Sequence, residues 1–183
     1  MPRRRRKKTK KHRTSRKKKY NKYTMKNIYG KKLQPCSLDS SDYMGSWDQN
    51  GYCSELGGGV HQICMNVSDD TKNFAKDTYQ SSNWSTDRVN NPHCMCLGAW
   101  SLYKARQNAN HIPKTNNELN CHAIPEYALS KHYINKWSTW NGNELPEQIT
   151  DGIDSLHQQC RNIDDISSQQ YLDNLVKNIK QHY

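Results

Sequence analysis

Residues 60–67 read VHQICMNV, a short run of mostly apolar side chains bounded by turn-forming residues. Such a run is typical of a buried strand, and residues 118–123 form a second candidate of the same kind. Around these two segments the apolar residues recur at helical spacing. We therefore expect an α+β fold, a small single domain with a short sheet and several helices.

Local signals place five helices along the chain. Ser68 followed by Asp69 and Asp70 indicates an N-cap and an acidic first turn. Pro125 and Pro146 suit the first turn of the helices that follow them. The predicted helices cover residues 69–79, 97–107, 126–136 and 146–161, and a closing amphipathic helix carries Leu172, Leu175, Val176 and Ile179 on one face. Phe74 is the only phenylalanine, so we expect Tyr and Trp to supply much of the aromatic core and their polar groups to need partners.

The charge is divided sharply along the chain. Through Lys32 the sequence carries six Arg and eleven Lys with no acidic residue, and the rest carries eleven basic and seventeen acidic residues, a net charge of −6. All of the positive excess therefore lies at the N-terminus. We expect a disordered polycationic arm at residues 1–26, a cysteine-containing α+β domain at 27–162 and a C-terminal amphipathic helix at 163–183.

The arm is predicted to bind nucleic acid or another polyanion without sequence preference. Each phosphate contact releases counterions, so an arm making roughly 6 to 10 contacts should lose about 10³ to 10⁵ in affinity between 50 and 200 mM salt. A nuclear localisation signal and a contact with an acidic membrane surface are the alternatives. The predicted contact residues are Arg3, Arg4, Arg5, Arg6, Lys7, Lys8, Lys10, Lys11, Arg13, Arg16, Lys17, Lys18 and Lys19.

The sequence shows no apolar stretch long enough to cross a bilayer and no apolar segment of a secretory signal. We therefore expect an intracellular protein, in the nucleus or a virion rather than secreted. The chain has seven cysteines. An odd number without an export signal favours small buried thiols or a metal site over a disulfide framework.

The densest set of soft ligands is HCMC at residues 93–96. Together with two earlier residues it gives a candidate zinc set of His61, Cys64, His93, Cys94 and Cys96. Two cysteines separated by a single residue are poorly placed to bind the same zinc ion, because paired ligands usually have two to four residues between them. We therefore predict no cofactor and keep zinc as the alternative. A second alternative is redox or nucleophilic chemistry at Cys94 and Cys96, with His93 lowering a thiol pKa.

Several segments fall in the order of a known pattern. They are NIYGKKLQPCS at 27–37, NGYC at 50–53, GVHQIC at 59–64, residues 67–74, NWST at 83–86 and HCMCLGAW at 93–100 with residues 103–105. In these motifs the chain resembles the bacterial and viral family called domain of unknown function 2237. Residues 125–160 and the asparagine-rich composition are similar to proteins from large DNA viruses of eukaryotes. The family implies no known activity, and Pro125 and the shifted His122 depart from its pattern, so a role for the family's histidine does not carry over to His122.

Two functions follow from these observations. The first, which we favour, is a non-enzymatic nucleic-acid-associated or virion structural protein, whose basic arm binds polyanion and whose acidic body docks to a protein partner. The second is an enzyme or metal-binding protein that uses the Cys and His set, with the arm as a nuclear targeting signal. The charge division favours the first, and the Cys and His motifs favour the second.

Overall fold

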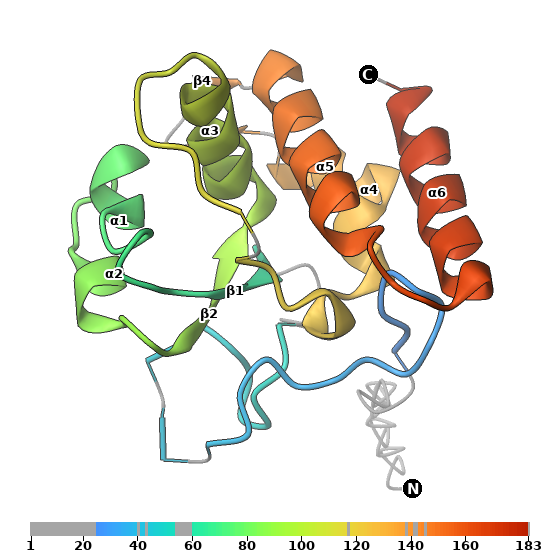
Figure 1. Cartoon of the computed structure of the whole chain (residues 1–183), viewed down its shortest axis with the longest axis horizontal. Coiled ribbons are helices and arrows are strands. Elements are labelled where there is room, and N and C mark those ends of the chain that lie inside the picture. Colours follow the sequence, from blue (N-terminus) through green and yellow to red (C-terminus); the bar gives the residue numbers. More distant parts are fainter. Residues whose placement is uncertain are drawn as a thin grey trace, which may run out of the picture.

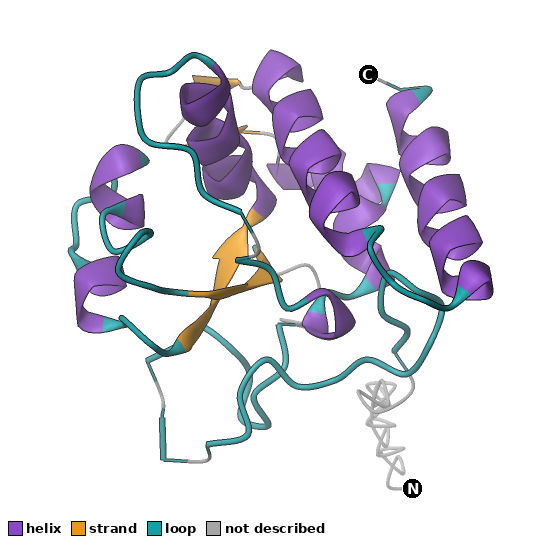
Figure 2. Cartoon of the chain, viewed as in Figure 1, coloured by secondary structure: helices purple, strands orange, loops and turns teal. Residues whose placement is uncertain are grey.

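The computed structural model describes residues 25–39, 41–42, 44–53, 60–116, 118–137, 139–140, 143–144 and 146–182. In this part of the chain, helices and a small antiparallel sheet build an α+β domain, as predicted (Figure 1). Helices contain more of the described residues than strands do (Figure 2). None of the helices in these ranges is both long enough and apolar enough to cross a membrane.

The sheet is a two-stranded antiparallel ribbon. β1 (His61–Asn66) pairs with β2 (Pro92–Cys96), with Cys64 opposite Cys94 and an irregularity between His61 and Ile63. The prediction of a strand over 60–67 is confirmed. β2 coincides with the HCMC motif, for which the sequence analysis predicts no strand. A second ribbon joins β3 (Thr139–Trp140) to β4 (Asn143–Glu144).

Long helices pack on one side of this sheet. In Figure 1, α5 lies beside both α3 and α6, and α1 and α2 lie on the far side of the sheet from α6. The helical segments are α1 (Phe74–Asp77), α2 (Trp84–Asp87), α3 (Leu97–Asn108), η2 (Cys121–Ala123), η3 (Glu126–Leu129), α4 (Lys131–Trp137), α5 (Pro146–Cys160) and α6 (Ile166–Lys180).

The central element is α3, which follows β2 directly. Cys96 caps it, since its sulfur accepts a hydrogen bond from the Ala99 N–H at 3.2 Å. Helix α5 can approach closely because residue 152 is glycine: a Cβ there would lie 2.0 Å from the Ser101 Oγ. At the same crossing the Trp100 indole N–H donates to the Gly152 carbonyl at 3.0 Å. Close packing of α3 against α5 therefore depends on this glycine.

Tyrosine and tryptophan fill the core as expected, and their polar groups have partners. Trp100, Tyr103 and Tyr133 are among the largest fully buried side chains. The Tyr133 hydroxyl donates to the Val60 carbonyl at 2.6 Å, and the Tyr29 hydroxyl donates to the Cys160 carbonyl at 2.7 Å. These bonds satisfy groups that would otherwise be costly to bury.

Three of the five predicted helices are confirmed. α3, α5 and α6 match the predictions, and α6 buries Leu172, Val176 and Ile179. The predicted helix over 69–79 is wrong for residues 69–73, which form turns before α1. Residues 126–136 form η3 and α4 instead of one helix. The strand predicted over 118–123 is also wrong, since only a Leu119 to Met65 bridge forms before η2.

The first described residues are part of the body. Leu33 N–H donates to the Met25 carbonyl at 2.8 Å, and Glu126 N–H donates to the Lys26 carbonyl at 3.0 Å. Lys26 also forms an isolated bridge with Lys32. Two residues that were assigned to the arm therefore hydrogen bond to the folded part. Residues 1–24 of the predicted arm lie outside the described residues.

Candidate functional site

The most concentrated chemistry of the described chain is a group of cysteines between the sheet and the loop of residues 36–53. Cys64 on β1 and Cys94 on β2 are directly opposite each other, so their side chains leave the same face of the sheet. Cys36 and Cys53 stand at the two ends of the loop, which runs below the sheet in Figure 1. The loop thus brings the sulfur atoms of Cys36 and Cys53 next to those of Cys64 and Cys94.

Backbone hydrogen bonds hold the loop in this position. The Gly51 carbonyl accepts from the N–H groups of Cys36 and Ser37 at 2.7 and 3.2 Å, and Cys94 N–H donates to the Gly45 carbonyl at 2.7 Å. Gly51 has φ +76°, and a Cβ on it would lie 2.1 Å from the Ser37 oxygen. Only glycine accommodates both the left-handed backbone and this close approach.

Six of the seven cysteines form disulfides. The pairs are Cys36–Cys64, Cys53–Cys94 and Cys121–Cys160, with Cα–Cα distances of 5.7, 5.3 and 5.6 Å. The expectation of free buried thiols is therefore wrong for these six. The spacing of seven cysteines does not determine their partners, and the fold brings together residues that are 28 to 41 positions apart.

Cys96 is the cysteine of the described residues that lies outside the disulfides; it is buried, and its sulfur accepts the Ala99 N–H. Cys94, the other thiol of the proposed nucleophilic pair, is bonded to Cys53. His93 precedes Cys94 on β2, and alternation along a strand directs their side chains to opposite faces of the sheet. The pair of free thiols beside His93 that the redox alternative requires is therefore not present in this structure.

His93 is held as a neutral ring. Its imidazole stacks on Trp84 with the ring centroids 3.8 Å apart, and its Nδ1 is buried without a hydrogen-bond partner. Burial first, and then the positive charge of Arg88, lower the pKa of His93 to about 3. A neutral imidazole does not stabilise a thiolate as an imidazolium would, so His93 does not perform the predicted activation.

The five residues of the predicted zinc set do not form a zinc site in this structure. Cys64 and Cys94 are in disulfides, and His93 lies on the other face of the sheet from Cys94. Among the described residues, the three metal-type ligand atoms that lie together are the sulfurs of Cys36, Cys53 and Cys94, within 4.8 Å of one another. Two members of that group, Cys36 and Cys53, were absent from the predicted set.

A buried cation pairs with an acidic residue beside this cluster. Arg88 donates from Nη1 to the Asp42 carboxylate at 2.6 Å, and its guanidinium lies 5.1 Å from the centre of the Trp47 ring. A cavity of about 490 Å³ opens along the same loop. It is lined by Pro35, Ser37, Leu38, Asp39, Asp42, Trp47, Asp48, Gln49, Asn50, Gly51 and Tyr52. Asp42 is neutralised by Arg88, and Asp39 and Asp48 accept hydrogen bonds from Ser41 and Asn50 of their own loop.

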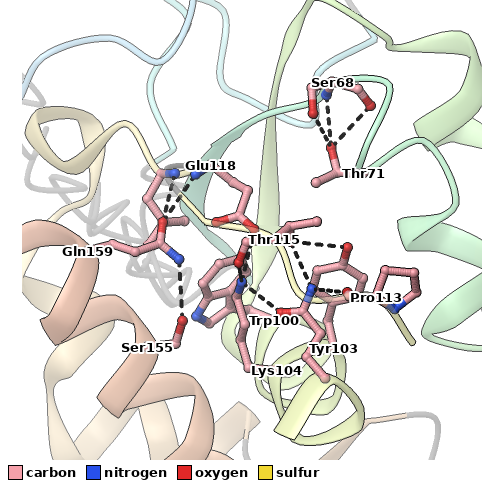
Figure 3. Close-up of polar contacts among 12 residues, drawn as sticks. Ser68, Thr71, Trp100, Tyr103, Lys104, Pro113, Thr115, Glu118, Ser155 and Gln159 are labelled. Atoms are coloured by element: carbon pink, nitrogen blue, oxygen red, sulfur yellow. Dashed lines mark hydrogen bonds and ion pairs between the residues drawn. The ribbon is translucent and has the colours of Figure 1, made fainter. Parts of the chain in front are cut away.

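A second buried ion pair joins Lys104 of α3 to Glu118. Figure 3 shows Lys104 pointing toward Glu118, with Nζ 2.9 Å from the carboxylate and 4.5 Å from the Trp100 ring centre. Lys104 also donates to the Thr115 carbonyl and to Gln107. Burial lowers the pKa of Lys104, while Glu118 opposes that shift. These contacts tie Thr115 and Glu118 to α3, a structural role that the sequence analysis did not predict.

The predicted nucleic-acid contacts, Arg3 through Lys19, lie outside the described residues, so the structure does not place them. No protein-family model matches the chain, and neither a curated protein nor a solved structure matches it.

Proposed function

We propose that this chain is a non-enzymatic, nucleic-acid-associated protein in which residues 1–24 bind the polyanion and the acidic body docks to a protein partner. The observation that carries this proposal is the division of charge. Thirteen basic residues lie between Arg3 and Lys19, whereas the chain after Lys32 has a net charge of −6. Nucleic acid attracts the first segment and repels the second, so binding is concentrated in the arm.

The body suits a docking unit because its reactive side chains are used to hold the fold. Lys104 is paired with Glu118, and their side chains are only 5% and 3% exposed. Six cysteines form cross-links, two of which join the loop to the sheet and one of which joins η2 to the end of α5. Such cross-links restrict the unfolded chain and stabilise a body short of aliphatic residues.

The disulfides favour oxidising surroundings over the cytosol, since glutathione and thioredoxin keep cytosolic thiols reduced. A virion is one of the settings in which disulfides persist. We propose a virion, rather than the nucleus, as the location of the protein.

The test compares binding of full-length protein and of a variant lacking residues 1–24 to random DNA and RNA oligonucleotides, measured by fluorescence anisotropy. The deletion ends at 24 because the Met25 and Lys26 carbonyls accept hydrogen bonds from the body. We expect binding to be lost with the arm while the circular dichroism spectrum of the body is kept.

Two control variants of the N-terminal arm distinguish the effect of its charge from the effect of its residue order. A scrambled arm of the same composition should bind as the wild type does, because counterion release depends on charge density. An arm with Gln in place of the thirteen basic residues between Arg3 and Lys19 should behave as the deletion does. Equal binding by the wild type and the deletion would contradict the proposal and favour a targeting role for the arm.

A further inference from the structure

Four sulfur atoms gather in one buried cluster, although their residues span positions 36 to 94. The Sγ atoms of Cys36, Cys53 and Cys94 all lie within 4.8 Å of one another, and Cys64 is bonded to Cys36. Cys53, Cys64 and Cys94 are completely buried and Cys36 nearly so. Two neighbouring disulfides therefore share a single site, from which two reductions would release four thiols side by side.

This spacing suits a tetrahedral zinc ion. Zinc–sulfur bonds of about 2.3 Å place the four sulfurs of a tetrahedral site about 3.8 Å apart, and structural zinc sites commonly use four cysteines. To surround an ion of that kind, the two sulfurs of each disulfide must separate to about 3.8 Å, while the Cys36 sulfur already lies within 4.8 Å of those of Cys53 and Cys94. The third disulfide, Cys121–Cys160, is not part of this group.

The scaffold around the cluster does not rely on the disulfides alone. The loop is also held by the bonds from Cys36 and Ser37 to the Gly51 carbonyl and from Cys94 to the Gly45 carbonyl. The two sheet cysteines are fixed by the pairing of β1 with β2. Reduction of the sulfur bonds therefore leaves the four side chains directed at the same place.

We propose that the reduced protein binds one Zn²⁺ through Cys36, Cys53, Cys64 and Cys94, so that this one site alternates between two disulfides and a zinc–thiolate centre. A dithiol supplies the reduction: each protein disulfide takes two electrons and two protons, and the dithiol becomes a disulfide. Zinc then displaces the four thiol protons and forms four zinc–sulfur bonds. A small-molecule disulfide reverses the change: two such molecules take up four electrons and four protons and become four thiols, the two protein disulfides form again, and Zn²⁺ is released. This inference does not depend on the proposed function of the arm.

The ligand set differs from the one that the HCMC motif suggested. It keeps Cys64 and Cys94, and it replaces His61, His93 and Cys96 with the two loop cysteines. The strained single-residue spacing of Cys94 and Cys96 is thereby avoided, because only one of them binds the ion. Variants of His93 and Cys96 consequently serve as controls.

The experiment uses the full-length, untagged chain. It is reduced with a water-soluble phosphine, which becomes the phosphine oxide, and is mixed with excess ZnCl₂, desalted and analysed for metal by mass spectrometry. We expect about one zinc per chain in the reduced protein and none in the oxidised protein. Substitution with Co²⁺ should give the intense visible absorption and thiolate charge-transfer bands of a tetrahedral sulfur site. Absence of stoichiometric zinc from the reduced protein would overturn the inference.

Variants identify the ligands. Cys53→Ser and Cys36→Ser should lose stoichiometric zinc, whereas Cys96→Ser, His93→Phe and the double variant Cys121→Ser with Cys160→Ser should keep it. Loss of zinc from His93→Phe or Cys96→Ser, with retention in Cys53→Ser, would contradict the proposed ligands. If the reduced apoprotein unfolds, addition of zinc should restore its circular dichroism spectrum, since binding energy then supports folding. Failure of zinc to restore that spectrum would count against the site.

Discussion

Cys64 and Cys94 lie directly opposite each other on β1 and β2, yet each forms its disulfide with a cysteine of the loop of residues 36–53. A bond between the two strands would add little to a pair that hydrogen bonds already hold together. Bonds to Cys36 and Cys53 instead fasten both ends of the loop to one point on the sheet. The position of this loop is thus determined by the disulfides, by backbone hydrogen bonds to the Gly45 and Gly51 carbonyls and by the close approach at Gly51.

Gly51→Ala is expected to destabilise the oxidised protein. The new Cβ would meet the Ser37 carbonyl oxygen at 2.1 Å in a residue whose φ is +76°. A strained backbone position of this kind costs about 1–3 kcal/mol, and displacement of Ser37 adds to it. Urea unfolding measures the free energy of unfolding. Asn50→Ala, an exposed neighbour, is the control and should stay within about 0.5 kcal/mol of wild type. An equal effect of the two variants would show that the approach at Gly51 is unimportant.

Lys104→Met is expected to lower the free energy of unfolding by roughly 3–5 kcal/mol, because it leaves the buried Glu118 carboxylate without its cation. The Nζ to carboxylate distance of 2.9 Å and the near-complete burial of both side chains make this a tight pair. Replacing both residues with methionine should cost less than Lys104→Met alone, since no unpaired charge then remains. A double variant as unstable as the sum of the single variants would contradict a direct interaction.

His93 is expected to make the protein sensitive to mild acid. Its pKa is about 3 in the folded state, because of burial and then Arg88, and about 6.5 in the unfolded chain. The unfolded state therefore binds the proton first, so the stability that neutral His93 permits is complete above about pH 6.5 and decreases as the pH falls toward 3.

Between pH 7 and pH 5 this difference amounts to a loss of about 2 kcal/mol. His93→Phe keeps a ring against Trp84 but cannot take up a proton, so its unfolding free energy should change less over the same interval. Urea unfolding at both pH values provides the comparison. Parallel pH dependence of wild type and His93→Phe would show that this histidine is not responsible.

The sequence alone predicted the elements whose residue pattern lies within one continuous segment. α5 and α6 have apolar faces over three or more turns, and residues 61–66 have turn formers at both ends. α3 is instead buried on nearly every side from Leu97 to Lys104. Ser68 precedes residues 69–73 and resembles a helix N-cap. Thr71, however, hydrogen bonds with Ser68, and the segment forms a turn instead of a helix. A short polar segment follows such local bonds, because it has little apolar surface to bury.

The cysteine site depended on distant contacts that no local pattern contains. The HCMC motif drew attention to Cys94 and Cys96, yet the partners of the strand cysteines are Cys36 and Cys53 in a polar loop. The ion pair of Lys104 with Glu118 likewise joins residues that are 14 positions apart. Strand alternation could have separated His93 from Cys94 if residues 92–96 had been interpreted as a strand.

The salt dependence of binding to random double-stranded DNA tests the central claim most directly. The plot of log K against log salt concentration has a slope of about −0.9 for each phosphate neutralised, so roughly 6 to 10 contacts predict a slope of about −5 to −9 for the full-length chain. We predict that the slope disappears when residues 1–24 are removed. A shallow slope for the full-length chain, unchanged by that deletion, would contradict a polyanion-binding arm.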